Sequence, residues 1–529
     1  MAGEVNAAGI ARRVFDLRIA NATAFNSAET AFGRAGIAVI AIILIRAIVL
    51  AATPLSFDEA YYWLWSKHLA AGYLDHPPLI AFLIRAGTIL LGDSSAGVRA
   101  APWLLSAAAT WAVWRSATRI TNRAEAGAIS ALLFNLMPMI AVESGVATPD
   151  SPEIAAAAFL LLFLTKIAET GYGPWWIAAG IAAGFALIAK YTGFFLGAGI
   201  LVWLAAVPKQ RRWFVSFWPY LGAAVALAMF APVVAWNAQH GWISFAMQFG
   251  RTGAGAFTLR YLGEFLGGQL LLATPFIAAL GAIGIIAAFR CSKAGDLRLI
   301  ACLMIPGMAY FAWHSLHDRV QGNWPSFLYP GLAVAAAAVY LNLPENSRIL
   351  TLLRRLTIPL AALLVTGIYS QALFDVIPGV RDPVSRLLAY GMDRVVGDID
   401  GWRAQEHATA IVTTNYALTG WLSFYLPGHP PVIQLNERSR YLNEAPPDSR
   451  LFRGPLIYVS QVRNEKLDYL SRRFAHVAPL GRVLRTRNGA KIDEYAIYRL
   501  DGPTGEVLSF GSGERGAKAP VSLQPTSGP

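Results

Sequence analysis

The sequence predicts a mainly helical protein that crosses a membrane many times and carries a small α/β region near its C-terminal end. Composition is the first reason, because 55% of the 529 residues are hydrophobic and only 14% are charged, unlike a soluble protein. The second reason is a series of long apolar runs that ends near residue 376. The third is the mixed polar sequence that follows this series, which is typical of a soluble region.

Membrane spans are expected where apolar runs approach the roughly 17 to 25 residues that a helix needs to cross a bilayer. With the N-terminus inside, Lys and Arg fall almost throughout in the loops that lie on the cytoplasmic side. The excess of 44 Lys and Arg over 32 Asp and Glu therefore indicates topology and not a nucleic-acid partner. The eleven expected spans are 33–53, 98–118, 125–145, 152–168, 174–189, 191–207, 213–236, 263–289, 299–313, 325–343 and 356–376.

Two interfacial helices are expected on the outer surface between the first two spans. The segment 58–70 contains Tyr61, Tyr62, Trp63 and Trp65, ring types that settle at headgroup depth. The segment 77–92 is apolar but short, and it would invert the charge pattern of every later loop if it spanned the membrane. We therefore predict two surface helices joined by the turn Tyr-Leu-Asp-His-Pro-Pro.

The soluble region should lie outside, because eleven spans from a cytoplasmic N-terminus end on the outer face. Its strand-like segments "AIVTTNYAL", "PVIQL", "PLIYVS" and "DEYAIYRL" are separated by Pro, Gly and Asn, which favours a small α/β domain. The tail from residue 501 is rich in Gly, Ser, Pro and Lys and is expected to be disordered. The expected domains are a cytoplasmic segment 1–32, a transmembrane domain 33–376, an α/β domain 377–500 and a tail 501–529.

Polar clusters interrupt the apolar sequence at points that the topology places on the outer face. They are Asp58-Glu59, Asp75-His76, Thr148-Pro149-Asp150, the junction at Lys190, and the stretches "WNAQHGW" and "HSLHDRVQGNWP". The sequence contains no Walker loop and no dinucleotide fingerprint, which argues against an ATP-driven pump and against a Rossmann-type sugar-nucleotide enzyme.

Each of these residues also has an ordinary structural explanation. A carboxylate at a membrane boundary is usually a helix N-cap, and this explanation fits Asp58 after Ser56 and Asp150 before a Ser-Pro pair. Lys190 separates two apolar runs, where a lone ammonium is costly unless it meets an anion or reaches water by snorkelling. Structural roles are equally open for the histidines His240, His314 and His317.

In this order the clusters resemble the C-type polytopic (GT-C) glycosyltransferases. The resemblance is to the branch with protein O-mannosyltransferases and the bacterial transferases that add aminoarabinose or galacturonate to lipid A and lipopolysaccharide core. It covers residues 33–376 and rests on the Asp-Glu pair, the Asp-His-Pro-Pro turn, Asp150, "ALIAKYTG" and "SLHDRVQGNWPSFLYP". The Asn-Trp-Pro element stands where the aminoarabinose enzymes have Lys-Leu-Pro, so the sequence looks most like the galacturonosyl-type members.

The resemblance implies that a sugar passes, with inversion, from a polyprenyl phosphate donor to a lipid A, lipopolysaccharide or related acceptor at the periplasmic side of the bacterial inner membrane. Asp58 would be the base and Glu59 would shape the site. Cationic groups would stabilise the leaving phosphate, and other polar groups would orient the acceptor or bind a divalent ion, whose identity stays open. The implied phosphate-binding residues are Lys190, Arg251 and Arg319, and the orienting residues are Asp75, His76, Asp150, His240, His317 and Asn323.

The expected partners are the polyprenyl phosphate sugar, a lipid or glycolipid acceptor and membrane lipids, with no nucleic acid, no certain cofactor and a monomeric chain. Protein O-mannosylation stays open as an alternative within the same resemblance. A secondary transporter or lipid flippase is the alternative of another class. Against it, we find no paired interrupted helices in two related halves, and the charges gather at one face instead of at mid-membrane depth.

Overall fold

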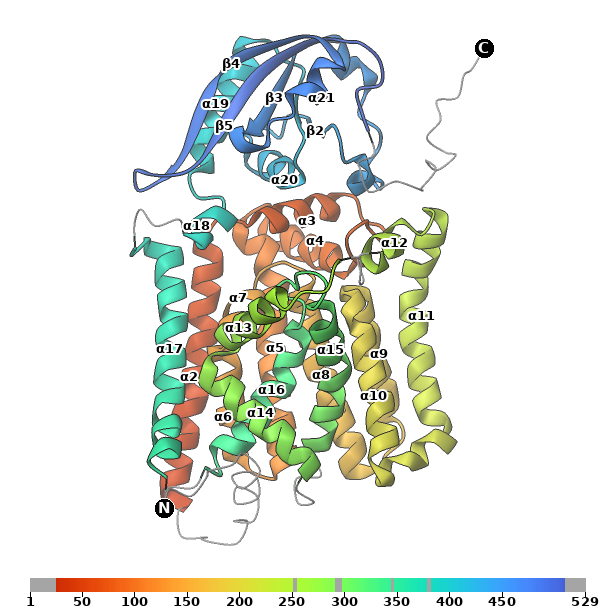
Figure 1. Ribbon diagram of the computed structural model, residues 1–529, viewed down its shortest axis with the longest axis vertical. Helices are drawn as coiled ribbons and strands as arrows, with labels where there is room; N and C mark the ends of the chain where they lie inside the picture. Colours follow the sequence, from red (N-terminus) through yellow and green to blue (C-terminus); the bar gives the residue numbers. More distant parts are fainter. Residues whose placement is uncertain (1–24, 251–254, 291–296, 344–346, 378–381, 510–529) are drawn as a thin grey trace. The chain divides into compact units, whose positions relative to one another are not determined.

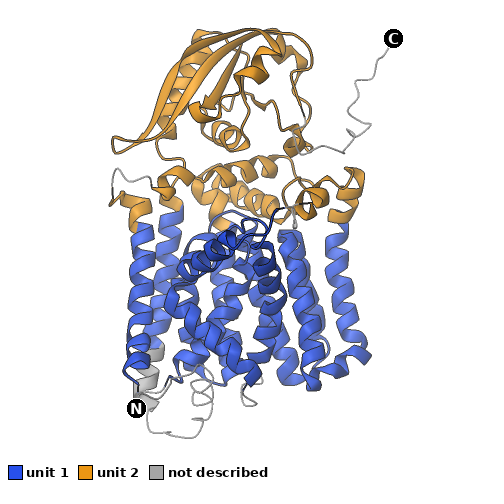
Figure 2. Cartoon of the chain, viewed as in Figure 1, with its two compact units in different colours: residues 1–50, 101–232, 251–369 blue, residues 51–100, 233–250, 370–529 orange. Residues whose placement is uncertain are grey.

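In a computed structural model of the chain, the described residues are 25–250, 255–290, 297–343, 347–377 and 382–509 (Figure 1). The chain divides into two compact units, each built from several stretches of sequence (Figure 2). Unit 1 comprises residues 1–50, 101–232 and 251–369, and unit 2 comprises residues 51–100, 233–250 and 370–529. Each unit is described below by itself.

Unit 1 is helical throughout its described residues, as the sequence predicts. Four of its helices, α2, α5, α11 and α17, continue at one end into residues of unit 2. The helices are α2 Phe25–Ala52, α5 Ser95–Thr121, α6 Ala124–Leu136, α7 Pro138–Glu143, α8 Asp150–Thr170, α9 Trp175–Ala189, η1 Tyr191–Gly193, α10 Phe194–Ala206, η2 Pro208–Val215, α11 Phe217–Gln239, α13 Arg260–Ala273, α14 Pro275–Arg290, α15 Leu297–His314, η4 Ser326–Leu328, α16 Tyr329–Tyr340 and α17 Arg348–Phe374.

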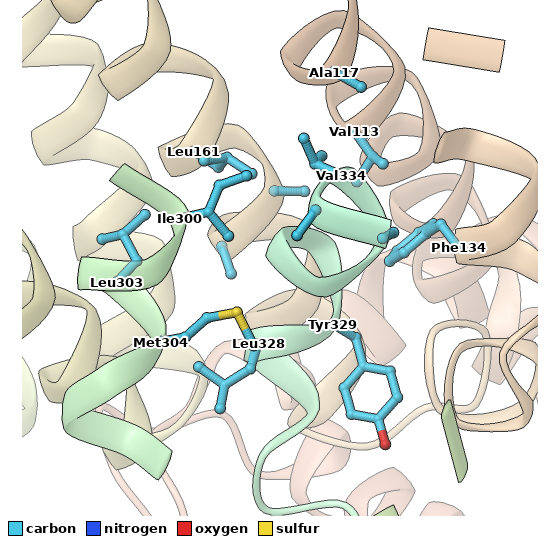
Figure 3. Close-up of a cluster of buried hydrophobic side chains, with 14 of the residues drawn as sticks. Val113, Ala117, Phe134, Leu161, Ile300, Leu303, Met304, Leu328, Tyr329 and Val334 are labelled. Atoms are coloured by element: carbon cyan, nitrogen blue, oxygen red, sulfur yellow. The ribbon is translucent and has the colours of Figure 1, made fainter. Parts of the chain in front are cut away.

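The core of unit 1 is a cluster of aliphatic and aromatic side chains from α5, α6, α8, α15 and α16 (Figure 3). Small residues allow the helices to approach closely. A Cβ atom at Gly284 of α14 would lie 2.8 Å from the carbonyl oxygen of Ala335 in α16. Such small-residue contacts are the usual way in which helices pack within a membrane, where burial of apolar surface gives little driving force.

The helices that correspond to the eleven expected spans differ in length. Among the described residues, five helices are long and apolar enough to cross a membrane, or up to seven if two bent pairs each count as one span. Three other expected spans correspond to the shorter apolar helices Ala124–Leu136, Trp175–Ala189 and Ser326–Tyr340, and the segment expected as a surface helix forms the short apolar helix Leu79–Leu91. The structure thus confirms a mainly helical chain with several candidate spans, and the count of eleven stays a prediction.

Two of the expected spans are broken at identifiable residues. The run 263–289 forms α13 and α14, which bend by 103° where Thr274 has a positive φ of 63° and precedes Pro275. The run 125–145 breaks at Met137, because Pro138 lacks the amide hydrogen that would continue α6. Neither run is one continuous helix, because a residue with positive φ or a proline breaks a helix without changing the apolar composition of the run.

Unit 2 joins the first outer segment of the chain to its C-terminal region. The two expected surface segments are helices, although their place at a membrane interface stays a prediction. The elements are α3 Phe57–Lys67, α4 Leu79–Leu91, α12 Ile243–Phe249, α18 Pro383–Leu387, α19 Met392–Gln405, β1 Ala410–Thr413, α20 Tyr416–Tyr425, β2 Val432–Gln434, η5 Arg438–Tyr441, η6 Ser449–Arg453, β3 Leu456–Gln461, η7 Val462–Asn464, α21 Leu467–Ser471, β4 Phe474–Arg487 and β5 Ala490–Pro503.

The C-terminal region contains a mixed sheet with the strand order β2-β1-β3-β5-β4 in the described residues. Strand β1 pairs in parallel with β2 and β3, and β5 pairs antiparallel with β3 and β4. Asn488 and Gly489, both with positive φ, turn the chain between β4 and β5. Helices α19 and α20 pack on one face of this sheet through Val396, Leu422 and their neighbours.

The C-terminal region also packs directly on α3. The amide of Ala389 donates to the carbonyl of Leu55 at 2.9 Å, and Ser56 forms an isolated β-bridge with Leu388. Helix α20 approaches α3 so closely that a Cβ atom at Gly420 would lie 2.8 Å from the amide nitrogen of Tyr61. The packing therefore groups residues 51–100 with the α/β region, and the boundary that we drew at 377 from the sequence stays a prediction.

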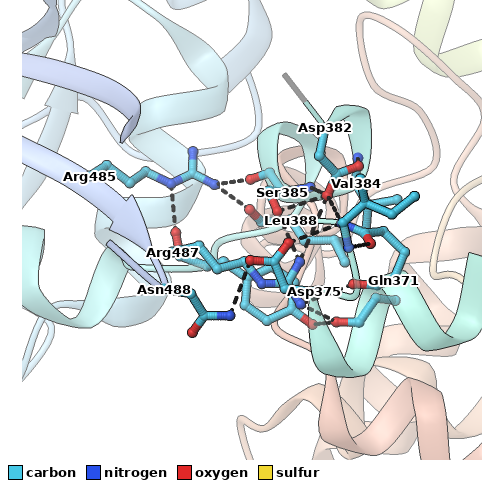
Figure 4. A network of polar contacts seen from close by, with 12 residues as sticks. Gln371, Asp375, Asp382, Val384, Ser385, Leu388, Arg485, Arg487 and Asn488 are labelled. Carbon is cyan, nitrogen blue, oxygen red and sulfur yellow. Dashed lines mark hydrogen bonds and ion pairs between the residues drawn. The ribbon is translucent and has the colours of Figure 1, made fainter. Parts of the chain in front are cut away.

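Buried arginines tie the β4–β5 hairpin to the segment that follows α17 (Figure 4). Arg485 donates to the carbonyl oxygens of Tyr390 and Ser385 at 2.8 and 2.6 Å. Arg487 donates to the carbonyl oxygen of Ala372 at 2.6 Å.

Beyond the hairpin, β5 continues past residue 501, and the amide of Ser509 donates to the carbonyl of Leu435 at 2.8 Å. Residues 501–509 of the expected disordered tail are therefore ordered, and the rest of the tail lies outside the described residues.

Candidate functional site

The start of α3 is capped by Ser56, which leaves Asp58 without a capping role. The Ser56 hydroxyl accepts from the amide of Glu59 at 3.2 Å, and the Glu59 carboxylate accepts from the amide of Ser56 at 2.9 Å. This reciprocal arrangement is a capping box. The alternative explanation of Asp58 as the N-cap is thus wrong, because Ser56 already fills that position.

Glu59 is buried and forms an ion pair with Arg99. The guanidinium contacts the two carboxylate oxygens of Glu59 at 2.6 and 2.5 Å and donates to the carbonyl of Thr53 at 2.9 Å. Both oxygens of Glu59 are therefore engaged in holding α3 against the start of α5. Of the Asp-Glu pair, this leaves Asp58 as the carboxyl that can take part in chemistry.

Asp75 lies in the turn between α3 and α4 and is held by Arg440. The Arg440 guanidinium contacts the two carboxylate oxygens at 2.6 and 2.5 Å, and the Tyr61 hydroxyl donates to Asp75 at 2.9 Å. The side chains of Arg440 and Asp75 are only 17% and 14% exposed. One nitrogen, Nη1, makes both contacts, and this largely buried pair together with Tyr61 fixes the direction of the Asp75 carboxylate.

Asp58 belongs to the same cluster through Tyr416, whose hydroxyl donates to its carboxylate at 3.3 Å. The pKa of Asp58 is raised to about 7, mainly by burial and then by the negative charge of Asp75, although the Tyr416 hydrogen bond and the Arg440 charge act in the opposite direction. A carboxyl with such a pKa exchanges a proton readily near neutral pH, which is the property that a general base needs. Asp58 is the group in this cluster with that property.

The two histidines that the sequence places near this cluster have different surroundings. The ring of His76 is half-buried, with its centroid 6.2 Å from that of Tyr62. His240 stacks on Trp236 and donates from Nδ1 to the Trp236 carbonyl at 2.8 Å. The contacts of His240 are those of a structural imidazole, so its predicted orienting role gains no support from the geometry.

Within unit 1, Asp150 is the centre of a second polar cluster. Lys190 and Ser326 donate to one carboxylate oxygen at 2.8 and 2.7 Å, and Asn323 donates to the other at 2.9 Å. Asp150 is 2% exposed and Lys190 is 5% exposed. The alternatives of a solvated N-cap for Asp150 and a snorkelling Lys190 are therefore wrong. The side chains of Lys190 and Asn323, from two of the sequence motifs, meet at Asp150.

Glu153, which lies one turn after Asp150 in α8, was not predicted as a site residue from the sequence. Glu153 is fully buried and accepts a hydrogen bond from Thr192, and its Oε2 atom finds no donor among the described residues. Two buried carboxylates thus adjoin the ammonium of Lys190. Lys190 therefore has a role in charge balance within unit 1 besides any contact with a ligand.

The other predicted phosphate-binding residues, Arg251 and Arg319, and the predicted orienting residue His317 are not part of the Asp150 cluster in the described residues. Arg319 is 57% exposed and pairs with Glu264 at 2.8 Å, and His317 contacts the carbonyl of Trp313 at 3.1 Å. Arg251 lies outside the described residues. The structure brings neither Arg319 nor His317 into the Asp150 cluster, because Arg319 pairs with Glu264 of α13 and His317 bonds to Trp313 of α15.

Several known proteins are similar to parts of this chain. The family described as dolichyl-phosphate-mannose-protein mannosyltransferase matches residues 75–236. The lipid A galacturonosyltransferase RgtD of Rhizobium johnstonii is 26% identical over 305 residues, which are 56% of this chain and 63% of that protein. The undecaprenyl phosphate-alpha-4-amino-4-deoxy-L-arabinose arabinosyl transferase 1 of Pseudomonas fluorescens is 28% identical over 156 residues, 28% of this chain and 27% of that protein. The chain thus spans less than two thirds of the length of these relatives.

The fold gives the broader match. The crystal structure of ArnT from Cupriavidus metallidurans bound to undecaprenyl phosphate has a TM-score of 0.62 at 16% identity, over 88% of this chain and 99% of that chain. The chain has the GT-C glycosyltransferase fold. The apo structure of the same ArnT agrees, with a TM-score of 0.59. The resemblance to the GT-C glycosyltransferases that the sequence motifs predicted is confirmed.

Two residues of the GT-C chain that complete the Asp58–Asp75 cluster could not be found from the motifs. Tyr416 of α20 lies 358 residues after its partner Asp58, and Arg440 of η5 lies 365 residues after its partner Asp75. Both lie in mixed polar sequence, where an Arg or a Tyr has no pattern that distinguishes it. Among the described residues, no group of three or more His, Cys, Asp or Glu side chains is placed to hold a metal ion.

Proposed function

We propose that the chain is an inner-membrane glycosyltransferase that moves a sugar from a polyprenyl phosphate to lipid A, lipopolysaccharide or a related envelope acceptor on the periplasmic side. The observation that carries the proposal is Asp58, a partly buried carboxyl with a pKa of about 7, held beside Asp75 and Tyr416 at the start of an outer helix. The GT-C fold supports the reaction class. The relatives named for transfer to lipid A and for an undecaprenyl phosphate sugar support the acceptor and the donor.

The proposed chemistry is a single displacement at the anomeric carbon. The ionised Asp58 takes the proton of the acceptor hydroxyl while the acceptor oxygen forms its bond to that carbon. The bond from the carbon to the phosphate oxygen breaks, and the polyprenyl phosphate leaves with the electron pair, which inverts the configuration. One acid–base group suffices, because phosphate is a good leaving group without protonation.

The phosphate is proposed to meet fixed cations. Lys190 is our first candidate, with Arg251 or Arg319 as the others, and Lys190 already neutralises Asp150. A phosphate at Lys190 would therefore share the ammonium with a buried carboxylate, which lowers the gain from each contact. The orienting roles of Asp75, His76, Asp150, His317 and Asn323, and any divalent cation, stay predictions of the same proposal.

Mass spectrometry of the cell envelope tests the acceptor. Lipid A and core oligosaccharide from a deletion strain should be lighter than those of the parent by the mass of one transferred sugar. The wild-type gene should restore the difference, and the gene with Asp58→Asn should not, although its protein reaches the membrane in equal amount. Identical lipid A and core masses in the deletion strain and its parent would rule out this acceptor class.

Protein O-mannosylation is the second candidate, because the matching family is described as a protein mannosyltransferase. It predicts that exported proteins of the deletion strain lose mannose while lipid A and core keep their masses. Glycoproteomic analysis of the same two strains therefore separates the two acceptors. If the deletion strain keeps both the sugar on lipid A or core and the mannose on exported proteins, the acceptor is another envelope glycan.

A further inference from the structure

The C-terminal α/β region supplies an arginine to the carboxylate cluster that carries the proposed base. Resting on the proposed function, we propose that Arg440 is a positioning residue of the glycosyl transfer, which holds Asp75 and, through Tyr416, sets the ionisation of Asp58. The C-terminal region would then be part of the active site and not an appended domain. All four residues, Asp58, Asp75, Tyr416 and Arg440, lie in unit 2.

The first step is the fixed position of the C-terminal region on α3. Ala389 bonds to the backbone of Leu55, and the indole of Trp421 donates to the same carbonyl at 3.3 Å. Gly420 lets the backbone of α20 approach that of α3 directly. Residues of the C-terminal region near this contact therefore have defined positions relative to Asp58, which lies in the first turn of α3.

The second step is the reach of one guanidinium across the cluster. Arg440 contacts both oxygens of Asp75, lies over the ring of Tyr416 at 4.4 Å, and pairs with Glu437 at 3.0 Å. The Tyr416 hydroxyl then donates to Asp58. Arg440 thus restrains Asp75 by a largely buried ion pair and restrains Tyr416 by a cation–π contact.

The third step is the charge balance at Asp58. The groups that face it are Glu59 on its own helix, Asp75 in the α3–α4 turn, Tyr416 on α20 and Arg440 on η5. Arg99 neutralises the charge of Glu59. The negative charge of Asp75, in contrast, is compensated by Arg440. Without Arg440, Asp75 would be an uncompensated negative charge beside Asp58, and deprotonation of Asp58 would become harder.

A merely structural ion pair would affect stability and leave the pH profile in place. Arg450 offers the matched comparison, because it pairs with Asp448 in the same C-terminal region but is 79% exposed and contacts neither carboxylate of the cluster. The two arginines therefore differ in whether they face Asp75. The experiment compares them in the full-length enzyme.

The measurement is the rate of sugar transfer from a polyprenyl phosphate sugar in nanodiscs, as a function of pH. In Arg440→Gln the acid limb of kcat/KM should move upward by at least about one pH unit, so that the rate below that limb falls about tenfold and recovers at higher pH. Arg440→Lys keeps the charge but loses the planar guanidinium that contacts Asp75 and Glu437 at once, so its limb should move less. Arg450→Gln should keep the wild-type limb.

The double variant Arg440→Gln with Asp75→Asn separates charge from folding. It removes both charges, so the acid limb should return toward the wild-type position even where the maximal rate stays low. Acid limbs of kcat/KM that stay at the wild-type pH in both Arg440 variants would overturn the inference. It would also be overturned if the acid limb of the double variant shifted as far as that of Arg440→Gln. If Asp58→Asn keeps full transfer, the proposed base itself fails, which is a different outcome from a failure of Arg440.

Discussion

At the scale of single residues, Asp58 lies in the first turn of α3, where carboxylates are common, but its pKa is raised to about 7. Its ionised form is the proposed base, so the transfer rate should rise with pH up to about 7 and then level off. The acid limb of the pH profile of kcat/KM measures this directly. Asp58→Glu, which keeps a carboxyl but moves it, should keep a limb at a lower rate, whereas Asp58→Asn should lose transfer at every pH. A limb that is absent from the wild-type enzyme would contradict the role of Asp58.

The same shift makes a prediction about stability. A carboxyl whose pKa rises from 3.8 to about 7 on folding stabilises the folded state at low pH, and this contribution is lost as the pH rises through about 7. Asp58→Asn, which stays neutral, should therefore gain melting temperature relative to the wild type between pH 4 and pH 7. Melting curves in detergent at several pH values provide the test. A constant difference across that range would mean that Asp58 has an ordinary pKa.

Lys190 can be tested within unit 1, because its carboxylate partner is known. Lys190→Ala leaves Asp150 buried without its cation, and the loss of one member of a buried ion pair typically costs about 3–5 kcal/mol. The double variant with Asp150→Asn should recover much of that stability. If Lys190 also binds the donor phosphate, the recovered double variant should still show a raised KM for the donor. A wild-type donor KM in that variant would leave Lys190 with the structural role alone.

At the scale of elements, the contact of α20 with α3 is the joint on which the outer cluster depends. Gly420→Ala adds a Cβ atom 2.8 Å from the backbone of Tyr61, so the helices must separate, at a cost of about 1–3 kcal/mol. Tyr416, on the same helix, should then lose its contact with Asp58, and transfer should fall. Gly401→Ala is the control, because Gly401 lies in α19 with nothing within 4 Å. Equal rates and equal protease resistance in both variants would show that the close approach is unimportant.

The elements also show how far sequence could go. The helices α3 and α4 and the carboxylates Asp58, Asp75 and Asp150 were predictable, because charged residues next to long apolar runs are conspicuous. The bend at Thr274 was not, since one residue with positive φ changes the path of a helix without changing its composition. Arg440 and Tyr416 were not predictable either. Their significance comes only from a tertiary contact with residues far away in sequence.

At the scale of the whole molecule, the topology predicts the location of the C-terminal end. An odd number of spans from a cytoplasmic N-terminus puts the α/β region in the periplasm, and Arg440 can reach Asp75 only if both lie on the same side. An alkaline phosphatase fused after the last residue should therefore be active, and a green fluorescent protein exported through the same route should stay dark. The opposite pattern would overturn the eleven-span topology together with the outer position of every site residue.

The ion pair between Asp75 and Arg440 joins residues that are 365 positions apart. A ribosome that has released Asp58 and Asp75 must still synthesise the later spans and most of the α/β region before Arg440 exists. Until then, Asp75 has no cation and the cluster around Asp58 is incomplete. On the proposed function, the growing chain would therefore insert into the membrane before it can transfer sugar, and a truncated product of interrupted translation would be inactive.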